Sequence, residues 1–416
     1  MALYEEIENL CKNAGAAAAK LSLVSTEKKN EALLRIAEAL REHADTLIEE
    51  NRRDLEAAEA NGVSRAMLDR LTLSQNRIEN IAQSLGDIAK LDDPIGKGEE
   101  WERPSGLHIR RERVPLGVVA IIYEARPNVT VDSAALCLKT GNAVVLRGGK
   151  EAIYTNTAIV RVIKEALDAC DLDPHSVELI ASTERESAQI LMTMRGYVDV
   201  LIPRGGKGLI RSVVDNATVP VIETGAGNCH LYVDDSADLE MALEIAVNAK
   251  CSRPSVCNAV ETVLVHAGIA PKFLPQFCKM MAEFNVEIRG CAKTRVLIPE
   301  AGEATEEDFY TEYNDYIVAV RVVDTLSDAI AHVNRYSTGH SEAIVTGDEA
   351  HGVRFQREVN SAAVYVNAST RFTDGGEFGF GAEIGISTQK LHVRGPMGLD
   401  ALTTEKYLIK GNGCIR

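Results

Sequence analysis

The chain has 416 residues, of which 45% are hydrophobic and 25% charged, and these ordinary globular values exclude wholesale disorder. Its length suffices for two or three domains with sizeable cores. A formal net charge of −16 excludes a general nucleic-acid binder, which would present a basic face. An anionic ligand would therefore have to be bound by a local group of Arg and Lys.

Nine cysteines are scattered without a CxxC pair, which argues against a disulfide framework and against a zinc site, so no metal is expected. The amino terminus is acidic and amphipathic, unlike a secretory signal, and no apolar run approaches the roughly 18 residues of a membrane span. We therefore expect thiols in a reducing cytoplasm, and neither a membrane nor a nucleic acid as partner.

Residues 1 to about 95 are rich in Ala, Leu, Glu and Arg, with apolar positions every three to four residues, which predicts helices. Residues 107–114 and 404–410 partly alternate apolar and charged side chains, which predicts exposed strands outside the main sheets. Because such strands need cover, we expect a homo-oligomer, a dimer or tetramer in which a partner subunit supplies it.

From residue 115 onward, strand and helix patterns alternate. The sequence predicts strands at 117–123, 143–146, 177–180, 198–203, 219–223, 230–233, 260–265, 317–323, 342–346 and 362–366, and helices at 132–140, 155–169, 185–194, 236–250 and 326–336. Repeated strand–helix units are typical of parallel, doubly wound sheets, so we expect an α/β fold with two α/β domains.

Cys257 lies on a polar segment, 252–259, between a helical pattern and the apolar run 260–265. A thiol on such a loop is placed to attack a substrate, whereas a cysteine kept for packing more often lies inside a helix or strand. The local pattern leaves both interpretations open.

Three glycine-containing turns follow predicted strands. Residues 204–208 (RGGKG) expose backbone N–H groups at a helix start, which suits a phosphate, although their spacing matches neither the dinucleotide GxGxxG nor a Walker P-loop. Residues 147–150 (RGGK) place two cations at a strand's carboxyl end, where they grip a ribose 2′-phosphate or form a solvated turn. Glu223 opens the turn 223–228 (ETGAGN) as a general base, a cofactor contact or an ordinary capping acid.

Cys257 follows Glu223 by 34 residues, with a predicted strand, an acidic turn and a helix between them. This order resembles the aldehyde dehydrogenase superfamily, in which a glutamate–glycine turn precedes the cysteine nucleophile by the same interval. Further segments similar to that superfamily are residues 115–118 (PLGV), 140–146 (TGNAVVL) and 311–316 (TEYNDY). Within this superfamily, four longer segments resemble those of the γ-glutamyl phosphate reductase family: 123–130 (YEARPNVT), 202–210 (IPRGGKGLI), 223–230 (ETGAGNCH) and 367–375 (NASTRFTDG).

The resemblance implies an aldehyde-dehydrogenase-like fold with a Rossmann-type NADP-binding domain (1–98 and 115–225), a catalytic domain (226–386) and a small β-strand oligomerisation arm (99–114 and 387–416). It implies NADPH-dependent reduction of L-glutamyl 5-phosphate to L-glutamate 5-semialdehyde and phosphate through a cysteine thioester, the second step of proline biosynthesis from glutamate. The alternatives are another acylating or hydrolytic aldehyde dehydrogenase, or a catalytically silent nucleotide-binding redox sensor. Because no kinase-sized segment precedes Met1, the partner that the resemblance implies is a separate glutamate 5-kinase.

By the resemblance, Cys257 is the nucleophile and Glu223 matches the family's general base. The segment that usually carries the oxyanion-hole asparagine is replaced by 126–128, so Asn128 and the backbone N–H of Cys257 become the candidate donors. At 147–150, an arginine in place of a lysine and the loss of an acid favour a 2′-phosphate, hence NADPH over NADH. The expected cofactor-binding residues are Arg147, Gly148, Lys150, Arg204, Gly205, Gly206, Lys207 and, at the nicotinamide ribose, Glu312.

Three arginines, Arg126, Arg253 and Arg371, are expected to bind the substrate's phosphate and α-carboxylate, because guanidinium forks match both groups. The alternative for each is a surface ion pair. Cys229 and Cys251, which lie near the nucleophile in sequence, are interpreted as packing residues.

Overall fold

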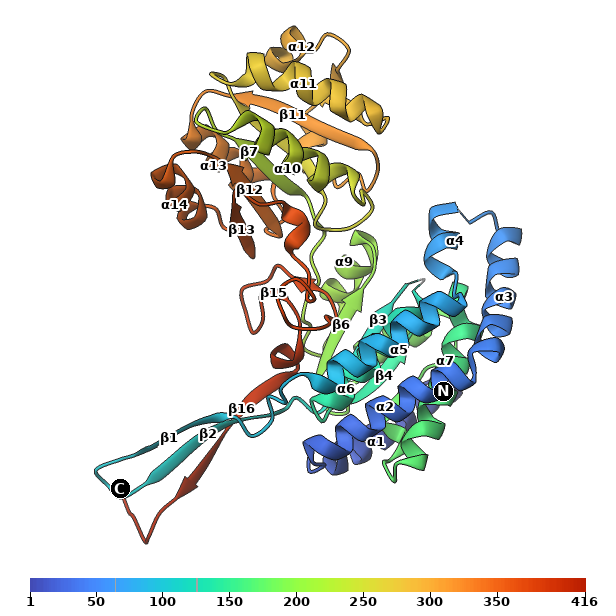
Figure 1. Ribbon diagram of the computed structural model, residues 1–416. Helices are drawn as coiled ribbons and strands as arrows, with labels where there is room; N and C mark the ends of the chain where they lie inside the picture. The colour runs from blue at the N-terminus through green and yellow to red at the C-terminus, as the bar shows by residue number, and fades with distance from the viewer. Residues whose placement is uncertain (64, 125) are drawn as a thin grey trace. The chain divides into compact units, whose positions relative to one another are not determined.

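The computed structural model describes residues 1–63, 65–124 and 126–416 (Figure 1). The chain divides into two compact units. Unit 1 comprises Met1–Thr224, Gly379–Gly385 and Met397–Arg416, and unit 2 comprises Gly225–Phe378 and Ile386–Pro396. Unit 1 thus contains both strands that the sequence analysis placed outside the main sheets, and the chain passes into unit 2 within the glycine-containing turn that begins at Glu223.

The amino-terminal region of unit 1 is helical, as predicted. It contains α1 (Ala2–Leu21), α2 (Thr26–Glu42), α3 (Ala44–Ala60), α4 (Arg65–Leu71) and α5 (Gln75–Lys90). Ser25 and Ser74 each accept a hydrogen bond from a first-turn backbone N–H, so side-chain caps start α2 and α5.

A four-stranded parallel sheet forms the centre of unit 1, with the order β5-β4-β3-β6. Its strands are β3 (Val118–Tyr123), β4 (Ala143–Arg147), β5 (Val177–Leu179) and β6 (Val200–Arg204), and the helices that alternate with them are α6 (Pro127–Lys139), α7 (Ile153–Ala169), α8 (Arg185–Met192) and α9 (Lys207–Asn216). Apolar residues of α1 and α8 pack in one core with β3 and β4, while α6 and α7 contact the sheet and carry α2, α3 and α5 as an outer layer. Helices on both faces explain why β3 is buried and apolar throughout and why β4 is so up to its last residue, Arg147.

Two predicted elements of unit 1 differ from the structure. Helix α6 begins at Pro127 rather than at 132, because proline is well suited to the first helical turn, where its missing N–H is not needed. Residues 219–223 do not form a full strand: Leu201 donates to the Pro220 carbonyl and accepts from Ile222 N–H, and a single bridge at Val221 results. Pro220 has no N–H to extend this pairing.

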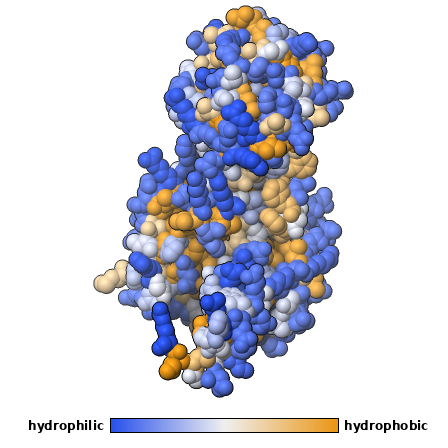
Figure 2. All heavy atoms as spheres, turned by 90° about the vertical axis from the view of Figure 1, so that its left-hand side faces the viewer, coloured by the Kyte–Doolittle hydropathy of each residue, from blue (hydrophilic) through white to orange (hydrophobic). Residues whose placement is uncertain are grey.

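The two exposed strands predicted outside the main sheets pair with each other. β2 (His108–Pro115) lies between β1 (Gly98–Glu102) and β16 (Thr403–Lys410) in an antiparallel three-stranded ribbon (Figure 1). The view in Figure 2 shows a largely hydrophilic surface with limited apolar areas. Large apolar side chains of the ribbon are exposed, namely Trp101, Tyr407, Leu408 and Ile409.

Unit 2 contains a seven-stranded parallel sheet with the order β10-β9-β11-β8-β7-β12-β13. Its strands are β7 (Cys229–Val233), β8 (Val260–His266), β9 (Glu287–Gly290), β10 (Gly302–Glu303), β11 (Ile317–Val323), β12 (Ser341–Val345) and β13 (Ala363–Val366), and its helices are α10 (Leu239–Cys251), α11 (Ala270–Glu283), α12 (Ala292–Leu297), α13 (Leu326–Tyr336) and α14 (Glu349–Glu358). One core lies between the sheet and α10 and α11, and a second lies between the sheet and α13 and α14. A short antiparallel pair, β14 (Ile386–Ser387) with β15 (Gly395–Pro396), completes the unit.

Both sheets are therefore parallel and covered by helices on two faces, as the repeated strand–helix pattern predicts. Among the described residues, no helix combines the length and the apolar character needed to cross a membrane.

Candidate active site

Cys257 lies in the turn between the end of α10 at Cys251 and the start of β8 at Val260. Its side chain is half-buried, unlike those of Cys229 and Cys251, which are buried. Burial raises the pKa of Cys229, and it raises the pKa of Cys251 to about 11, so both thiols stay protonated near neutral pH. Cys229 is more than a neighbour in sequence, because its Sγ donates to the Cys257 carbonyl at 3.2 Å.

Cys291 is a second accessible thiol in unit 2. It is half-buried at the start of α12. Although burial opposes this, hydrogen bonds from Thr294 and from Val322 N–H lower the pKa of Cys291. Thiolate character alone therefore does not single out Cys257, and its surroundings have to distinguish the two.

The turn after Glu223 packs directly against the Cys257 backbone. A Cβ built on Gly227 would lie 2.6 Å from Cys257 Cα and closer still to its carbonyl carbon and oxygen. Gly227 N–H donates to Glu312 Oε1 at 2.8 Å. Within unit 2, glycine is thus needed at 227 for close backbone approach, and this turn links the nucleophile segment to Glu312.

Arg253 and Arg371 both lie close to Cys257. Burial lowers the pKa of Arg371, the positive charge of Arg253 lowers it further, and Cys257 opposes the shift. Arg371 donates to Asn258 Oδ1 and, through Nε at 3.1 Å, to Ser252 Oγ. Asn258 returns hydrogen bonds to the carbonyls of Arg371 and Thr373, at 3.2 and 3.0 Å. The structure therefore brings two of the three predicted arginines to the nucleophile segment.

Asn258 is a site residue that the sequence analysis missed. It is 5% exposed and joins the segment after Cys257 to residues 370–373, which come more than a hundred positions later. Its position directly after the cysteine was the only signal in the sequence, and that signal does not reveal the long-range partner.

Asn128, Arg126 and Glu223 lie in unit 1, where Asn128 occupies the first turn of α6 and Arg126 precedes that helix. Asn128 Nδ2 donates to Asp132 Oδ2 at 3.1 Å. Burial raises the pKa of Asp132 to about 6, while Asn128 and the nearby Arg204 lower it. Ala125, which belongs to the motif 123–130, lies outside the described residues.

The glycine-rich loop before α9 is already contacted by a carboxylate. Gly206 N–H donates to Glu124 Oε2 at 2.9 Å, and Gly205 packs against the same carboxyl group. The loop does begin a helix, as predicted, with Lys207 as an exposed first residue. Glu124 is a second missed residue, and it occupies an N–H group that the sequence analysis assigned to a cofactor phosphate.

Arg147 and Lys150 differ in where their cations point. Arg147 donates to the carbonyls of Thr183 and Glu184, each at 3.0 Å, and burial lowers its pKa. Lys150 is exposed at the start of a short 3₁₀ helix after β4. Gly148 packs where a Cβ would meet Tyr123 and Asn156, so it serves close packing at the end of β4.

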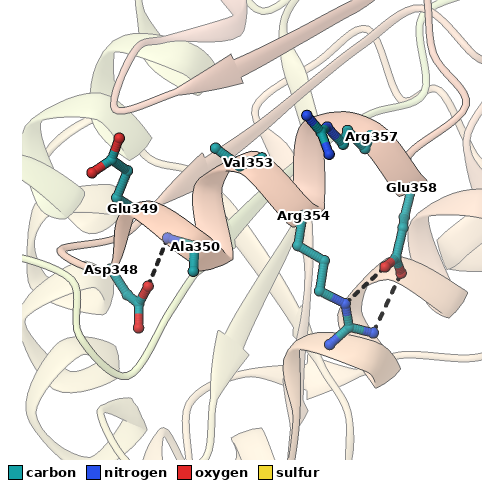
Figure 3. A pocket seen from close by; sticks show the side chains of 7 residues that line it. All are labelled: Asp348, Glu349, Ala350, Val353, Arg354, Arg357 and Glu358. Carbon is teal, nitrogen blue, oxygen red and sulfur yellow. Dashed lines mark hydrogen bonds and ion pairs between the residues drawn. The ribbon is translucent and has the colours of Figure 1, made fainter.

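A surface depression runs along α14 in unit 2 (Figure 3). Its described lining residues are Asp348, Glu349, Ala350, Val353, Arg354, Arg357 and Glu358. Arg354 pairs with Glu358, and Asp348 accepts the first-turn N–H of Ala350 (Figure 3). The predicted site residues are not among this lining, so the depression is unrelated to the chemistry of Cys257.

The model of the aldehyde dehydrogenase family matches residues 1–296. The chain belongs to the aldehyde dehydrogenase family. The predicted aldehyde-dehydrogenase-like α/β fold is thereby confirmed, and membership in this family implies a nicotinamide cofactor.

Full-length relatives in this family share one name. The chain is 60% identical over 413 residues to the γ-glutamyl phosphate reductase of Carboxydothermus hydrogenoformans, covering 99% of this chain and 100% of the relative. It is 57% identical over 412 residues to the protein of the same name from Moorella thermoacetica, covering 99% of each. The family resemblance read from the four long segments is therefore confirmed.

Solved structures agree with these relatives. The crystal structure of γ-glutamyl phosphate reductase from Thermotoga maritima matches with a TM-score of 0.96 at 48% identity, covering 99% of this chain and 100% of that one. An acetylating aldehyde dehydrogenase from Geobacillus thermoglucosidasius matches with a TM-score of 0.73 at 17% identity, covering 100% of this chain and 98% of that one, which shows the fold alone.

Proposed function

We propose that this chain reduces L-glutamyl 5-phosphate to L-glutamate 5-semialdehyde and phosphate, with NADPH, in the second step of proline biosynthesis from glutamate. The observation that carries the proposal is the shared name of relatives that are 54–60% identical over nearly their whole length. The chain's own chemistry supports it, since an accessible thiol lies beside two arginines, as reaction with an anionic acyl phosphate requires.

The first step takes place at Cys257. Its thiolate attacks the acyl carbon, the carbon–oxygen bond to phosphate breaks, and phosphate departs with the electron pair. A thioester on Sγ remains. Because phosphate is already a good leaving group, this step needs little acid catalysis.

Arginines hold the substrate's two anionic groups. Arg253 is exposed beside Cys257, and Arg371 is half-buried with its guanidinium fixed by Ser252 and Asn258. Fixed guanidinium forks bind phosphate and carboxylate in a defined orientation. Arg126, from unit 1, is the third ligand in the proposal.

The oxyanion of each tetrahedral species needs N–H donors, and the candidates remain Asn128 and the Cys257 backbone N–H. A donor of this kind typically lowers the barrier by about 3–4 kcal/mol. Asn128 Nδ2 donates to Asp132, and this contact orients the amide. An amide nitrogen carries two hydrogens, so one remains for the oxyanion while the other stays on Asp132.

The cofactor residues fit NADPH in part. Lys150 presents an exposed ammonium group at the carboxyl end of β4, which suits a 2′-phosphate, whereas Arg147 is directed to backbone carbonyls. Gly148, Arg204, Gly205, Gly206, Lys207 and Glu312 complete the proposed set. The Glu124 carboxylate at Gly206 N–H would compete with a cofactor phosphate there, so Lys150 carries the greater part of this proposal.

When bound, NADPH supplies the hydride that reduces the thioester. Collapse of the resulting thiohemiacetal restores the Cys257 thiolate and releases the aldehyde. No water has to be activated in this direction, and hydrolysis would waste the thioester, so Glu223 serves to position the cofactor rather than as a base towards water.

The proposal extends to the setting of the enzyme. It includes a cytoplasmic location and a homo-oligomer, and the exposed apolar side chains of the ribbon β1-β2-β16, which a partner subunit would cover, support the oligomer. A separate glutamate 5-kinase would supply the labile acyl phosphate.

The deciding experiment runs the reaction backwards with glutamate 5-semialdehyde and NADP⁺, followed at 340 nm. Sustained turnover should require inorganic phosphate, because only phosphate can release the acyl group as an acyl phosphate. Sustained turnover without phosphate would indicate hydrolysis, and turnover that requires coenzyme A would indicate an acylating dehydrogenase. If the protein binds NADP⁺ but the absorbance at 340 nm does not change, the protein is a catalytically silent nucleotide binder.

A further inference from the structure

A buried ion pair closes the segment that carries Cys257. Lys250, in the last turn of α10, places Nζ 2.6 Å from Oε2 of Glu261, the second residue of β8. Their side chains are 0% and 1% exposed. The residues between them include the turn with Cys257, so the pair joins the two elements on either side of that turn.

Glu261 also marks an irregularity in the sheet. Cys229 pairs with Val260 and His230 pairs with Thr262, so Glu261 is an extra residue between two consecutive pairs of β7 and β8. Such a bulge redirects a side chain and is common beside active sites. Here it accompanies a carboxylate buried under the nucleophile turn.

The second oxygen of Glu261 holds another segment. Glu261 Oε1 accepts the backbone N–H of Asn314 at 3.1 Å, and Asn314 has a positive φ of 55°. Two residues earlier, Glu312 accepts Gly227 N–H at 2.8 Å. Because Gly227 packs against the Cys257 backbone, the contacts form a closed ring from Lys250 through Glu261, residues 312–314 and Gly227 back to the nucleophile turn.

Tyr313 strengthens the same closed set of contacts. Lys250 Nζ lies 6.0 Å from the centre of the Tyr313 ring, and Tyr313 OH donates to Asp308 at 2.8 Å. The segment 312–314 is therefore held from two sides, by Glu261 through the backbone and by Asp308 through a side chain.

Stability does not explain why charged groups occupy these positions. A buried ion pair is often no more stabilising than apolar residues of similar volume. Burial raises the pKa of Glu261 to about 7, and Lys250 opposes the shift. What apolar residues would not supply is an acceptor for Asn314 N–H.

We propose that Glu261 is a positioning residue, whose Oε1 holds residues 312–314 through Asn314 N–H and thereby sets Glu312 and the Gly227 turn against Cys257, while Lys250 compensates its buried charge. The consequence for cofactor affinity rests on the proposed function, since Glu312 is expected to contact the nicotinamide ribose. The effect on the position of the Cys257 turn does not depend on the proposed function.

Two double variants separate an acceptor from a charge. K250M/E261Q removes both charges and keeps a carbonyl oxygen for Asn314 N–H, whereas K250M/E261M removes the acceptor as well. The first readout is the rate at which iodoacetamide alkylates Cys257, located by peptide mass spectrometry and measured without substrate or cofactor. The second is the Kd for NADPH from protein fluorescence.

Loss of one hydrogen bond to a buried acceptor corresponds to roughly a fivefold to tenfold change. We expect Cys257 of K250M/E261M to be alkylated about fivefold to tenfold faster than Cys257 of the parent protein, because the turn loosens. The Kd of this variant for NADPH should rise by a similar factor. K250M/E261Q should stay within about twofold of the parent in both readouts, since it keeps the hydrogen bond. Rescue by glutamine is an outcome that a purely volumetric role would not give.

Equal alkylation rates in both variants, or a slower rate in K250M/E261M, would overturn the inference. If K250M/E261M does not fold, K250M/E261S, whose hydroxyl is too short to reach Asn314, takes its place in the same comparison. If alkylation separates the variants but the parent protein itself does not bind NADPH, the positioning role stands and the proposed cofactor falls.

Discussion

Gly227→Ala is expected to disable the enzyme through the Cys257 backbone. The new Cβ would lie 2.6 Å from Cys257 Cα, with the carbonyl atoms closer still, whereas ordinary contacts begin at 3.4 Å. The obstructing atoms are backbone atoms, so the turn itself has to move by about 1 Å or more. A displacement of about 1 Å at a reacting group costs on the order of a hundredfold in rate. Overpacking should also cost about 1–3 kcal/mol of stability.

The assay compares kcat for semialdehyde oxidation with NADP⁺ and phosphate in the parent protein, in G227A and in G86A. Gly86 lies inside α5, where an added Cβ meets nothing within 4 Å, so G86A should keep parental turnover and be slightly more stable. We expect G227A to remain folded and to lose about a hundredfold in kcat. Parental kcat in a folded G227A protein would refute the argument that this turn sets the nucleophile's position.

Three further predictions concern other charged groups. Lys150→Glu should raise the Kd for NADPH far more than that for NADH, measured by fluorescence titration, and equal losses would remove the 2′-phosphate from Lys150. Arg371→Ala should raise KM for the substrate by about tenfold or more in steady-state assays, in line with the loss of a charged hydrogen bond, and an unchanged KM would exclude it from the site. His351 donates to Asp234 at 2.9 Å, which raises the pKa of His351 above 6.5, so its stabilising effect is complete at low pH and is lost as pH rises through the raised value. The urea midpoints of the parent and H351Q should therefore differ at pH 6 and converge by about pH 9, and a gap independent of pH would contradict this assignment.

Much of the fold is predictable from the sequence because the strands of the two parallel sheets are mostly apolar and the helices are periodic. The run 118–123 is wholly apolar and buried, and 260–265 is apolar except for Glu261 and Thr262, so neither run shows the regular polar alternation of a strand exposed on one face. Residues 219–223 look equally strand-like, but pairing there ends after one bridge, and a single sequence does not reveal how far a neighbouring strand extends. The start of α6 at Pro127 could not be predicted from apolar periodicity, because the first turn of this helix carries few apolar residues.

The candidate site was predictable residue by residue only where a motif carried it. Cys257 and Arg253 are predicted from the segment 252–259, which follows Glu223 at the family's interval, and Arg371 from the segment 367–375; the structure places all three in unit 2. The hydrogen bond from Gly206 to Glu124 spans 82 positions, and that from Asn258 to Arg371 spans 113. Contacts of this kind depend on which chain segments the fold makes adjacent, and local spacing does not encode them.

Whether Cys257 carries the acyl group is tested most directly by mixing the enzyme with glutamate 5-semialdehyde and NADP⁺ without phosphate. The parent protein should give a burst of absorbance at 340 nm equal to the enzyme present, intact mass spectrometry should show one added glutamyl group, and peptide mass spectrometry should locate it on Cys257. The thiol loses its proton, and the aldehyde is oxidised as NADP⁺ is reduced. C291A, which removes a half-buried thiol of unit 2 whose pKa is lowered, should behave like the parent, and C257A should show neither burst nor adduct while still binding NADPH. A burst in C257A, or an adduct on Cys291, would contradict the account.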